Sequence, residues 1–226
     1  MVSVCIASAT RYDESDFYSK SALGRSLRVA YRWFPVKPKI AFRNSAPLAV
    51  CYNGALASCE RDDIIVFTHD DVLLTDFFWV DRLESGFNRF DVLGVAGNAR
   101  RVPRQPTWLM IDDKGTPDDQ RNLSGMIGHG QGFPCKLSMY GVTGRPCKLL
   151  DGVFLAAKPH TLNKSGIRFD PQFPFHFYDM DWCRQADQAK LRMGTIPLCI
   201  VHESEGNANS PEWRTAYARY LAKWKE

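Results

Sequence analysis

The sequence predicts an α/β fold with a mainly parallel central sheet and helices on both faces. In the first hundred residues, short apolar runs alternate with segments whose apolar residues have helical spacing, in the order β-α-β-α-β-α-β. The composition, 45% hydrophobic and 24% charged, is typical of a soluble globular protein. A chain of 226 residues can bury one sizeable core, so we expect a single domain over residues 1–226.

The first elements follow from apolar spacing. Residues 2–9 form an apolar run that predicts a strand, and a polar loop with Thr10, Arg11 and Asp13 follows it. A helix is predicted next, and residues 39–42 suggest a second short strand. The helix is indicated by apolar residues at helical spacing: Leu23, Leu27, Ala30, Tyr31 and Phe34.

A second helix is predicted over residues 48–59, where apolar residues recur on one face. Asn53 lies off that face, either as an ordinary surface residue or as a polar group directed at a ligand. Residues 64–68 then read as a buried strand that runs directly into His69, Asp70 and Asp71. A helix over residues 75–86 and a strand over residues 91–97 complete the alternating pattern.

The periodic pattern is lost from residue 98 to residue 148, where glycine and proline are frequent. A connection of this length inside a compact domain is usually functional or partly disordered. We expect a long flexible loop region over residues 98–148. The segment has no Lys-Ser/Thr pair in a strand-turn-helix context, so it does not predict a phosphate-binding loop.

Strand character returns over residues 149–157, where Asp151 interrupts an apolar run and therefore needs a partner or a purpose. An aromatic loop at residues 169–178 leads to a helix with Asp179 and Asp181 in its first turn, where acidic residues are also favoured by the helix dipole. A strand over residues 194–201 ends at His202. The last helix, from residue 211, carries an aromatic stripe that we expect to be core packing.

Charge and cysteine content limit the possible partners. Basic residues outnumber acidic ones before residue 60, which suits phosphates, an anionic membrane surface or simply a solvated face. The seven cysteines have no CxxC spacing, so we expect reduced thiols and no zinc site. The start lacks a secretion signal and no apolar run is long enough to span a membrane, from which we expect a cytoplasmic protein.

Asp70 and Asp71 are the strongest indication of chemistry in this sequence. Ligands of open α/β sheets bind beyond the carboxyl ends of the strands, and adjacent carboxylates there suit a divalent cation with the phosphates that it holds. An acidic turn with a helix cap is the alternative interpretation.

Four segments of the chain, taken together and in order, carry a resemblance. They are His69-Asp70-Asp71-Val72, residues 150–156 around Asp151-Gly152, residues 175–183 with Asp179-Met180-Asp181, and Val201-His202-Glu203-Ser204. In this order they resemble the GT-A glycosyltransferases of the family 2 type, in particular the StrF-like branch. The resemblance implies an inverting transferase that uses Mn²⁺ or Mg²⁺ to move a sugar from a UDP- or GDP-sugar to a hydroxyl acceptor. No nucleic acid partner is expected.

The same resemblance assigns roles to individual residues. Asp71 and His202 would bind the metal, and Asp179, with Asp181 as the alternative, would be the general base. Asp70 would approach the ribose or sugar, while His69 departs from the family by replacing the first carboxylate of its DxD motif.

Further contacts to the nucleotide sugar are implied for residues in several predicted elements. These are Thr10, Arg11 and Asp13 for the nucleotide and Asp151 for the donor sugar or the acceptor. Asn53 joins these candidates only through its place off the apolar face of its predicted helix. The aromatic residues Phe175, Tyr178 and Trp182 would stack on a sugar ring or belong to the core.

Two other functions compete with transfer. A phosphoesterase or nucleotidyltransferase would use Asp70 and Asp71 to hold two metal ions. A non-catalytic module that binds nucleotide sugars would explain the departure at His69.

Overall fold

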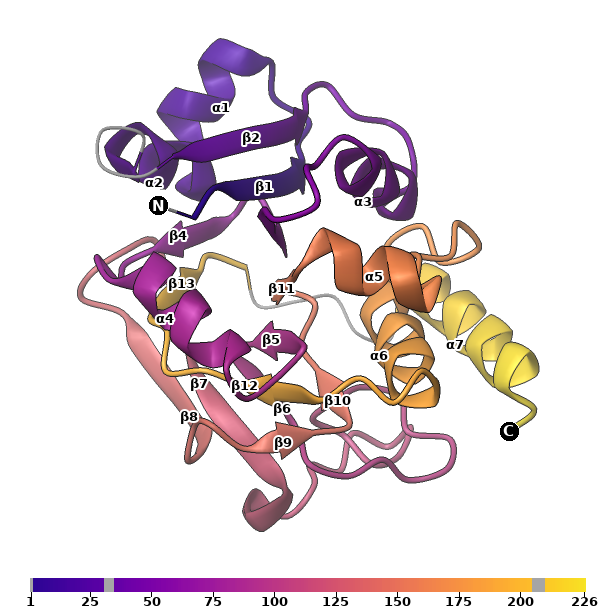
Figure 1. The fold of residues 1–226 in the computed structure, drawn as a ribbon. Coiled ribbons are helices and arrows are strands. Elements are labelled where there is room, and N and C mark those ends of the chain that lie inside the picture. Colours follow the sequence, from indigo (N-terminus) through magenta and orange to yellow (C-terminus); the bar gives the residue numbers. More distant parts are fainter. Residues whose placement is uncertain (1, 31–34, 205–209) are drawn as a thin grey trace.

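A computed structural model describes residues 2–30, 35–204 and 210–226 of the chain. Its central sheet has seven strands and the first three helices gather around one end of it (Figure 1). The strands in spatial order are β2 (Val36–Ala41), β1 (Val4–Ala9), β3 (Ile64–Thr68), β11 (Phe154–Ala157), β5 (Val92–Gly94), β12 (Met193–Thr195) and β9 (Pro146–Cys147).

The predicted α/β class is confirmed, and the central sheet is mixed in direction. Strand β1 is parallel to β2 and β3, and β12 is parallel to β5, but β11 runs antiparallel to β3 and β5. The chain reaches β11 from a second sheet and not through a helical crossover, so no rule requires a parallel pairing. As a result, β11 begins where β3 ends, and the Thr68 hydroxyl donates to the Val153 carbonyl at 2.8 Å.

The second sheet contains much of the segment for which we expected a loop. It has the order β10 (Leu149–Leu150), β6 (Ala96–Asn98), β7 (Leu123–His129), β13 (Ile200–His202) and β4 (Val72–Leu74), and β8 (Lys136–Gly141) pairs with β7. The glycines that suggested a loop are sites of close backbone approach. A Cβ on Gly125 would lie 1.9 Å from the Val95 carbonyl oxygen, and one on Gly141 would lie 2.4 Å from that of Leu123.

Helices α1 to α3 lie around β1 and β2, α4 packs on β5, and α5, α6 and α7 group together at the other side (Figure 1). Their bounds are α1 Glu14–Lys20, α2 Ala22–Ala30, α3 Leu48–Ala57, α4 Trp79–Phe87, α5 Pro159–Ser165, α6 Tyr178–Gln188 and α7 Pro211–Trp224, with a 3-10 turn at Gln120–Asn122.

Two helices differ from the sequence predictions. The unpredicted α1 is a polar helix that the Asp13 side chain caps by accepting from the Asp16 N–H at 2.9 Å. Helix α4 begins at Trp79 because Asp76 accepts from the Phe78 N–H and forms a turn before it. The end of the helix predicted from Leu23 onward, with Tyr31 and Phe34, lies outside the described residues.

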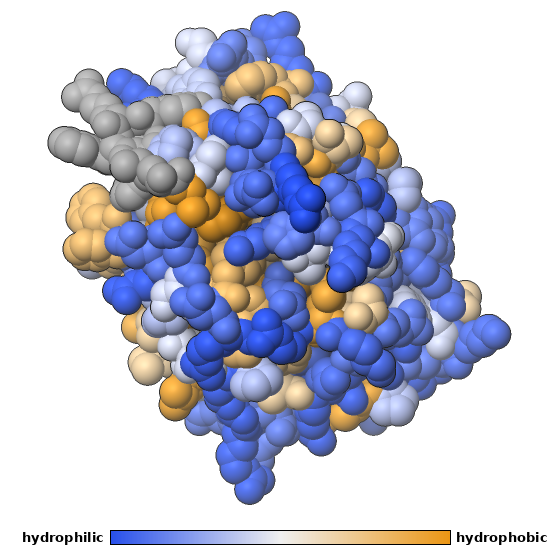
Figure 2. Space-filling view, viewed as in Figure 1, coloured by the Kyte–Doolittle hydropathy of each residue, from blue (hydrophilic) through white to orange (hydrophobic). Residues whose placement is uncertain are grey.

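The core is rich in aromatic side chains. Trp182 of α6 is fully buried and stacks on Phe169 with ring centroids 5.4 Å apart, so it belongs to the core and cannot reach a sugar. The stripe of α7 is also core, since Trp213, Ala216 and Tyr220 are buried. The face in Figure 2 is mainly hydrophilic. All seven cysteines are free thiols, and no described helix is both long and apolar enough to cross a membrane.

Candidate active site

A cavity of about 440 Å³ lies at the edge of the sheet where β3 ends and β11 begins. Among the described residues that line it, there are four carboxylates and neither a lysine nor an arginine. The predicted site residues that it brings together are His69, Asp70, Asp71, Asp151, Asp179 and His202. This concentration of negative charge would repel a diphosphate unless a cation neutralised it.

Strand pairing places His202 beside Asp71. In the antiparallel pair of β4 and β13, His202 is in register with Val72, and the Glu203 N–H donates to the Asp71 carbonyl at 3.0 Å. The His202 Nε2 atom then lies 3.3 Å from Asp71 Oδ1. Two residues far apart in sequence therefore meet through the sheet backbone, which fixes their relative position.

His69 completes this group from the end of β3. Its Nδ1 atom lies 4.0 Å from Asp71 Oδ1, and its Nε2 atom lies 2.7 Å from the Tyr178 hydroxyl. That hydroxyl in turn donates to the Gly152 carbonyl at 2.8 Å. One ligand atom from each of His69, Asp71 and His202 lies within 4.8 Å of the others.

The ionisation of Asp71 and His69 suits a cation. Burial raises the pKa of Asp71, but His202 and His69 outweigh it and bring that pKa down to about 2. Burial lowers the pKa of His69, which favours the neutral imidazole that metals bind. Burial opposes the charged form of His202, but its contact with Asp71 raises the pKa of that imidazole.

These residues fit a divalent metal ion. Asp71 Oδ1 is buried and lacks a hydrogen-bond partner among the described residues, although His202 is at ion-pair distance. An orphaned carboxylate oxygen between two imidazoles is a set of donors that imidazole-binding divalent metals accept. The group therefore has both the charge and the free ligand atom that such an ion requires.

Asp179 faces the same cavity from the start of α6. Phe177, with φ of 65°, occupies the N-cap position, so Asp179 lies in the first turn of the helix. Its carboxylate accepts from the Met180 N–H at 2.8 Å and the Gly152 N–H at 3.1 Å. Burial, with a smaller contribution from Asp151, raises the pKa of Asp179 to about 6.

Asp151 lies between Asp179 and the second sheet. Its Oδ2 accepts from the Trp108 indole N–H at 2.8 Å, and its Oδ1 accepts from the Val153 N–H at 2.9 Å. Both partners hold the carboxylate in one orientation at the cavity wall. The strand interruption that the sequence showed at Asp151 is thus a fixed polar group beside the candidate base.

The three predicted residues of the loop after β1 differ in their relation to the site. Thr10 is buried, and its hydroxyl hydrogen-bonds Asp70, a contact that partly offsets the rise that burial gives the pKa of Asp70. Arg11 is exposed, and it is not among the residues that line the cavity. Asp13 caps α1 and forms an ion pair with Arg43 at 3.1 Å, so its carboxylate is used within the loop.

Two predicted site residues have structural roles away from the cavity. The side-chain amide of Asn53 donates to the Phe169 carbonyl at 2.7 Å and accepts from the Phe169 N–H at 3.0 Å, which uses both of its polar ends. Asp181 is fully buried against α7, where it accepts from Trp224 Nε1 at 2.9 Å and pairs with Lys223 at 2.7 Å.

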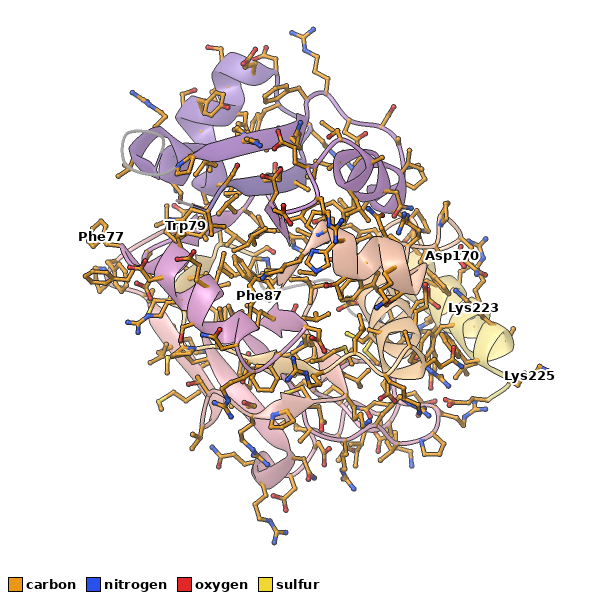
Figure 3. All side chains as sticks on the ribbon, in the orientation of Figure 1. Phe77, Trp79, Phe87, Asp170, Lys223 and Lys225 are labelled. Atoms are coloured by element: carbon orange, nitrogen blue, oxygen red, sulfur yellow. The ribbon has the colours of Figure 1, made fainter. Side chains whose placement is uncertain are left out.

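Figure 3 shows Lys223 beside Asp170, with which it also forms an ion pair of 2.7 Å. Lys223 therefore ties α7 to α6 and to the aromatic loop before it. Asp179 and Asp181 are two residues apart, and side chains at that spacing point to different sides of a helix. Asp181 therefore faces Lys223 while Asp179 faces the cavity. The structure gives no support to the role of Asp181 as a base or to a donor contact of Asn53.

A second group of metal-ligating side chains lies at the other end of β1 and consists of Cys5, Cys59 and Asp63. Lys37 Nζ contacts Asp63 at 3.1 Å, and the Cys5 thiol lies 3.2 Å from the same carboxylate. The ammonium group already balances the charge of Asp63, so this group does not need a cation.

Sequence reasoning missed two contributors to the site. Trp108 and Tyr140 line the cavity from the segment that we expected to be a flexible loop, with their rings 4.7 Å apart. Tyr178 is at the cavity through its hydroxyl and not as a stacking surface. The only sequence signal for Trp108 and Tyr140 is that they are isolated aromatic residues in a Gly/Pro-rich segment. Phe175, by contrast, remains half exposed on the cavity wall.

Comparison with solved structures identifies the architecture. S. aureus TarS (residues 1–349) aligns with 98% of this chain at a TM-score of 0.54 and 12% identity, and GalNAc-T7, solved with UDP, GalNAc and Mn²⁺, aligns with 98% at 0.54 and 9%. Both are GT-A glycosyltransferases. This chain has the GT-A fold.

A third solved structure, A197 from STIV, aligns with 93% of the chain at a TM-score of 0.50 and 12% identity. The chain spans 65% of the TarS fragment and 48% of GalNAc-T7, but 98% of A197. No protein-family profile and no curated protein sequence matches it. At these identities the shared GT-A fold is what the comparison establishes, including the α/β layers that the sequence predicted.

Proposed function

We propose that this protein is a metal-dependent inverting glycosyltransferase that moves a sugar from a nucleoside diphosphate sugar to a hydroxyl acceptor. One observation carries the proposal: Asp179 shares a cavity with the group of His69, Asp71 and His202. A base and a cation site at one sugar-sized cavity are the two parts that this reaction needs.

Asp71 and His202 would hold the divalent ion together with the donor diphosphate. When bound, the ion supplies Lewis-acid stabilisation of the charge on the leaving phosphate. The absence of lysine and arginine from the described lining residues supports this assignment, because the lining has no permanently charged cationic side chain in place of the metal ion. That GalNAc-T7 was solved with UDP and Mn²⁺ also supports a nucleotide donor and Mn²⁺ here.

Asp179 would be the general base. Its carboxylate takes the proton of the acceptor hydroxyl as the oxygen forms a bond to the anomeric carbon, and the bond from that carbon to the phosphate oxygen breaks with its electron pair. A raised pKa makes Asp179 a better proton acceptor than an ordinary carboxylate. Two backbone N–H groups fix its orientation, which favours a defined direction of attack.

The donor nucleotide would lie over the loop after β1, toward Thr10 and Asp70. The contact between these two side chains positions Asp70 beside the cavity, where its carboxylate can accept from a ribose or sugar hydroxyl. Arg11 would contribute from the rim of the loop.

The acceptor would enter from the second sheet. Trp108 and Tyr140 present apolar surface to the cavity, and Asp151 presents a carboxylate next to Asp179. Aromatic faces beside carboxylates are suited to sugar rings, whose C–H faces stack while their hydroxyls donate. This favours a carbohydrate hydroxyl as the acceptor.

The two competing functions have less support. A two-metal phosphoesterase would need a second ion near Asp70, whereas Asp70 is hydrogen-bonded to Thr10 and is not part of the described metal-ligating groups. A module without catalysis would not need Asp179 at the cavity with a pKa raised to about 6.

Thermal unfolding of the full chain tests donor binding. We expect UDP or GDP to raise Tm only in the presence of Mn²⁺, with a stabilisation of about 2.7 kcal/mol at a ligand concentration 100 times Kd. The Asp71→Asn variant should lose this rise in Tm. The control Asp62→Asn should retain it, because Asp62 lies before β3, at the opposite end of the strand from the cavity. No shift with either nucleotide and Mn²⁺ would remove the basis for a nucleotide-sugar donor.

A further inference from the structure

The departure from the DxD pattern at His69 gives the metal site a different ligand set. His69 and Asp71 lie two residues apart in the turn between β3 and β4, and His202 ends β13, so two separate backbone segments fix their positions. Donor atoms that share a metal with bonds of about 2.1 Å lie roughly 3 to 3.5 Å apart. The observed 3.3 Å from His202 and 4.0 Å from His69 to Asp71 Oδ1 are close to that requirement.

Hydrogen bonding fixes which nitrogen of His69 is free. The Tyr178 hydroxyl has a single proton, and it donates that proton to the Gly152 carbonyl at 2.8 Å. The hydroxyl can therefore only accept from His69 Nε2, 2.7 Å away, so that nitrogen carries the hydrogen. In a neutral imidazole the lone pair is then on Nδ1, the atom nearest to Asp71.

Gly152 is required for this chain of hydrogen bonds. A Cβ at position 152 would lie 2.3 Å from the Tyr178 hydroxyl oxygen and 2.8 Å from the Asp179 Cβ. Any larger residue would push Tyr178 away from His69. The Asp151-Gly152 pair of the sequence thus holds the second partner of His69 in place as well as the carboxylate of Asp151.

We infer that His69 Nδ1 is a third protein ligand of the metal and that Tyr178 is a positioning residue that sets its tautomer. The inference concerns the metal site of the proposed transferase. A ligand set of two imidazoles and one carboxylate selects Mn²⁺ and the later transition metals over Mg²⁺, which prefers all-oxygen ligands. The remaining coordination positions are left for oxygens of the substrate or of water.

Pulsed EPR of the full chain loaded with Mn²⁺, without nucleotide, counts the imidazoles bound to the ion. We expect two directly bonded imidazole nitrogens in the wild type and one in His69→Phe, which keeps a ring in the space but removes both nitrogens. His176→Phe is the matched control, because His176 lines the same cavity outside the metal-ligating group. It should retain two couplings.

Calorimetric titration with Mn²⁺ separates the ligand from its positioning residue. His69→Phe should weaken binding at least about 10-fold, and Tyr178→Phe about 10- to 100-fold, while Tyr178→Phe at saturation still shows two imidazole couplings. Mg²⁺ in about a tenfold excess should leave the Mn²⁺ signal unchanged.

The inference is overturned by a wild-type spectrum with one imidazole, by unchanged affinity in His69→Phe, or by ready displacement of Mn²⁺ by Mg²⁺. The wild-type spectrum decides the ligand count even where a variant does not fold. The EPR and calorimetric readouts do not depend on turnover. A chain that binds Mn²⁺ through two imidazoles but never cleaves a nucleotide sugar would contradict the proposed function and still support this inference.

Discussion

The Gly152 N–H donates to the Asp179 carboxylate at 3.1 Å and so joins the start of β11 to the start of α6 at the cavity. The carbonyl of the same glycine accepts from Tyr178, which contacts His69. One residue without a side chain therefore orients both the candidate base and the candidate metal ligand. Base and cation site are mechanically coupled through Gly152.

Asp179→Asn should abolish transfer but not donor binding. The amide cannot take a proton, so we expect kcat to fall by about 10²- to 10⁴-fold, the usual contribution of a general base. The substitution leaves His69, Asp71 and His202 unchanged, so KM for the donor and Mn²⁺ affinity should stay near the wild-type values. Steady-state kinetics with the folded variant checks this. An unchanged kcat would mean that Asp179 is not the base.

The rate of transfer should fall at acidic pH. The pKa of Asp179 is raised to about 6, so its carboxylate is protonated, and inactive as a base, as the pH drops through that value. We expect the acidic limb of kcat against pH to have an apparent pKa near 6 and to be absent from the residual activity of Asp179→Asn. A limb near the ordinary value of 3.8 would contradict the burial that we describe.

Asp181→Asn should reduce stability and spare catalysis. Asp181 is fully buried and pairs with Lys223 at 2.7 Å, so the change leaves a partly buried ammonium without that partner, although Asp170 remains beside it. We expect a loss on the order of 3 kcal/mol in the free energy of unfolding by urea. The turnover per folded molecule should match the wild type. If the variant lost turnover but kept the wild-type free energy of unfolding, Asp181 would again be a candidate for the general base.

Gly152→Ala should weaken metal binding, whereas Gly54→Ala should not. The added methyl at position 152 meets Tyr178 and displaces it from His69, while a methyl at position 54 of α3 meets nothing within 4 Å. The second variant should even raise the free energy of unfolding by about 0.5–1 kcal/mol, because alanine favours the helix. Calorimetry with Mn²⁺ and urea unfolding compare the two. Equal Mn²⁺ affinity in both variants would argue against the Gly152 coupling.

Local patterns predicted the α/β layers and the residues that meet at the cavity. Strand β3 and the acidic residues after it were recognisable because an apolar run ends abruptly in charge. The convergence of Asp71 with His202 was implied only by family resemblance, since it depends on the pairing of β4 with β13 across the sheet.

Strands β7 and β8 of the second sheet were not predictable, because their glycines serve close backbone approach and remove the alternation that marks a strand. The roles of Asn53 and Asp181 were missed for a related reason. Their partners, the Phe169 backbone and Lys223 of α7, are distant in sequence and carry no local signal.

The most direct test of the proposed transferase is the release of nucleoside diphosphate from UDP- and GDP-sugars by the full chain with Mn²⁺. Wild type, Asp71→Asn and Asp179→Asn should be compared with and without sugar acceptors. We predict metal-dependent release that a suitable acceptor accelerates and that both substitutions strongly reduce. Release that is equal in the wild type and both variants, or absent from the wild type with every donor and acceptor tried, would contradict the proposal.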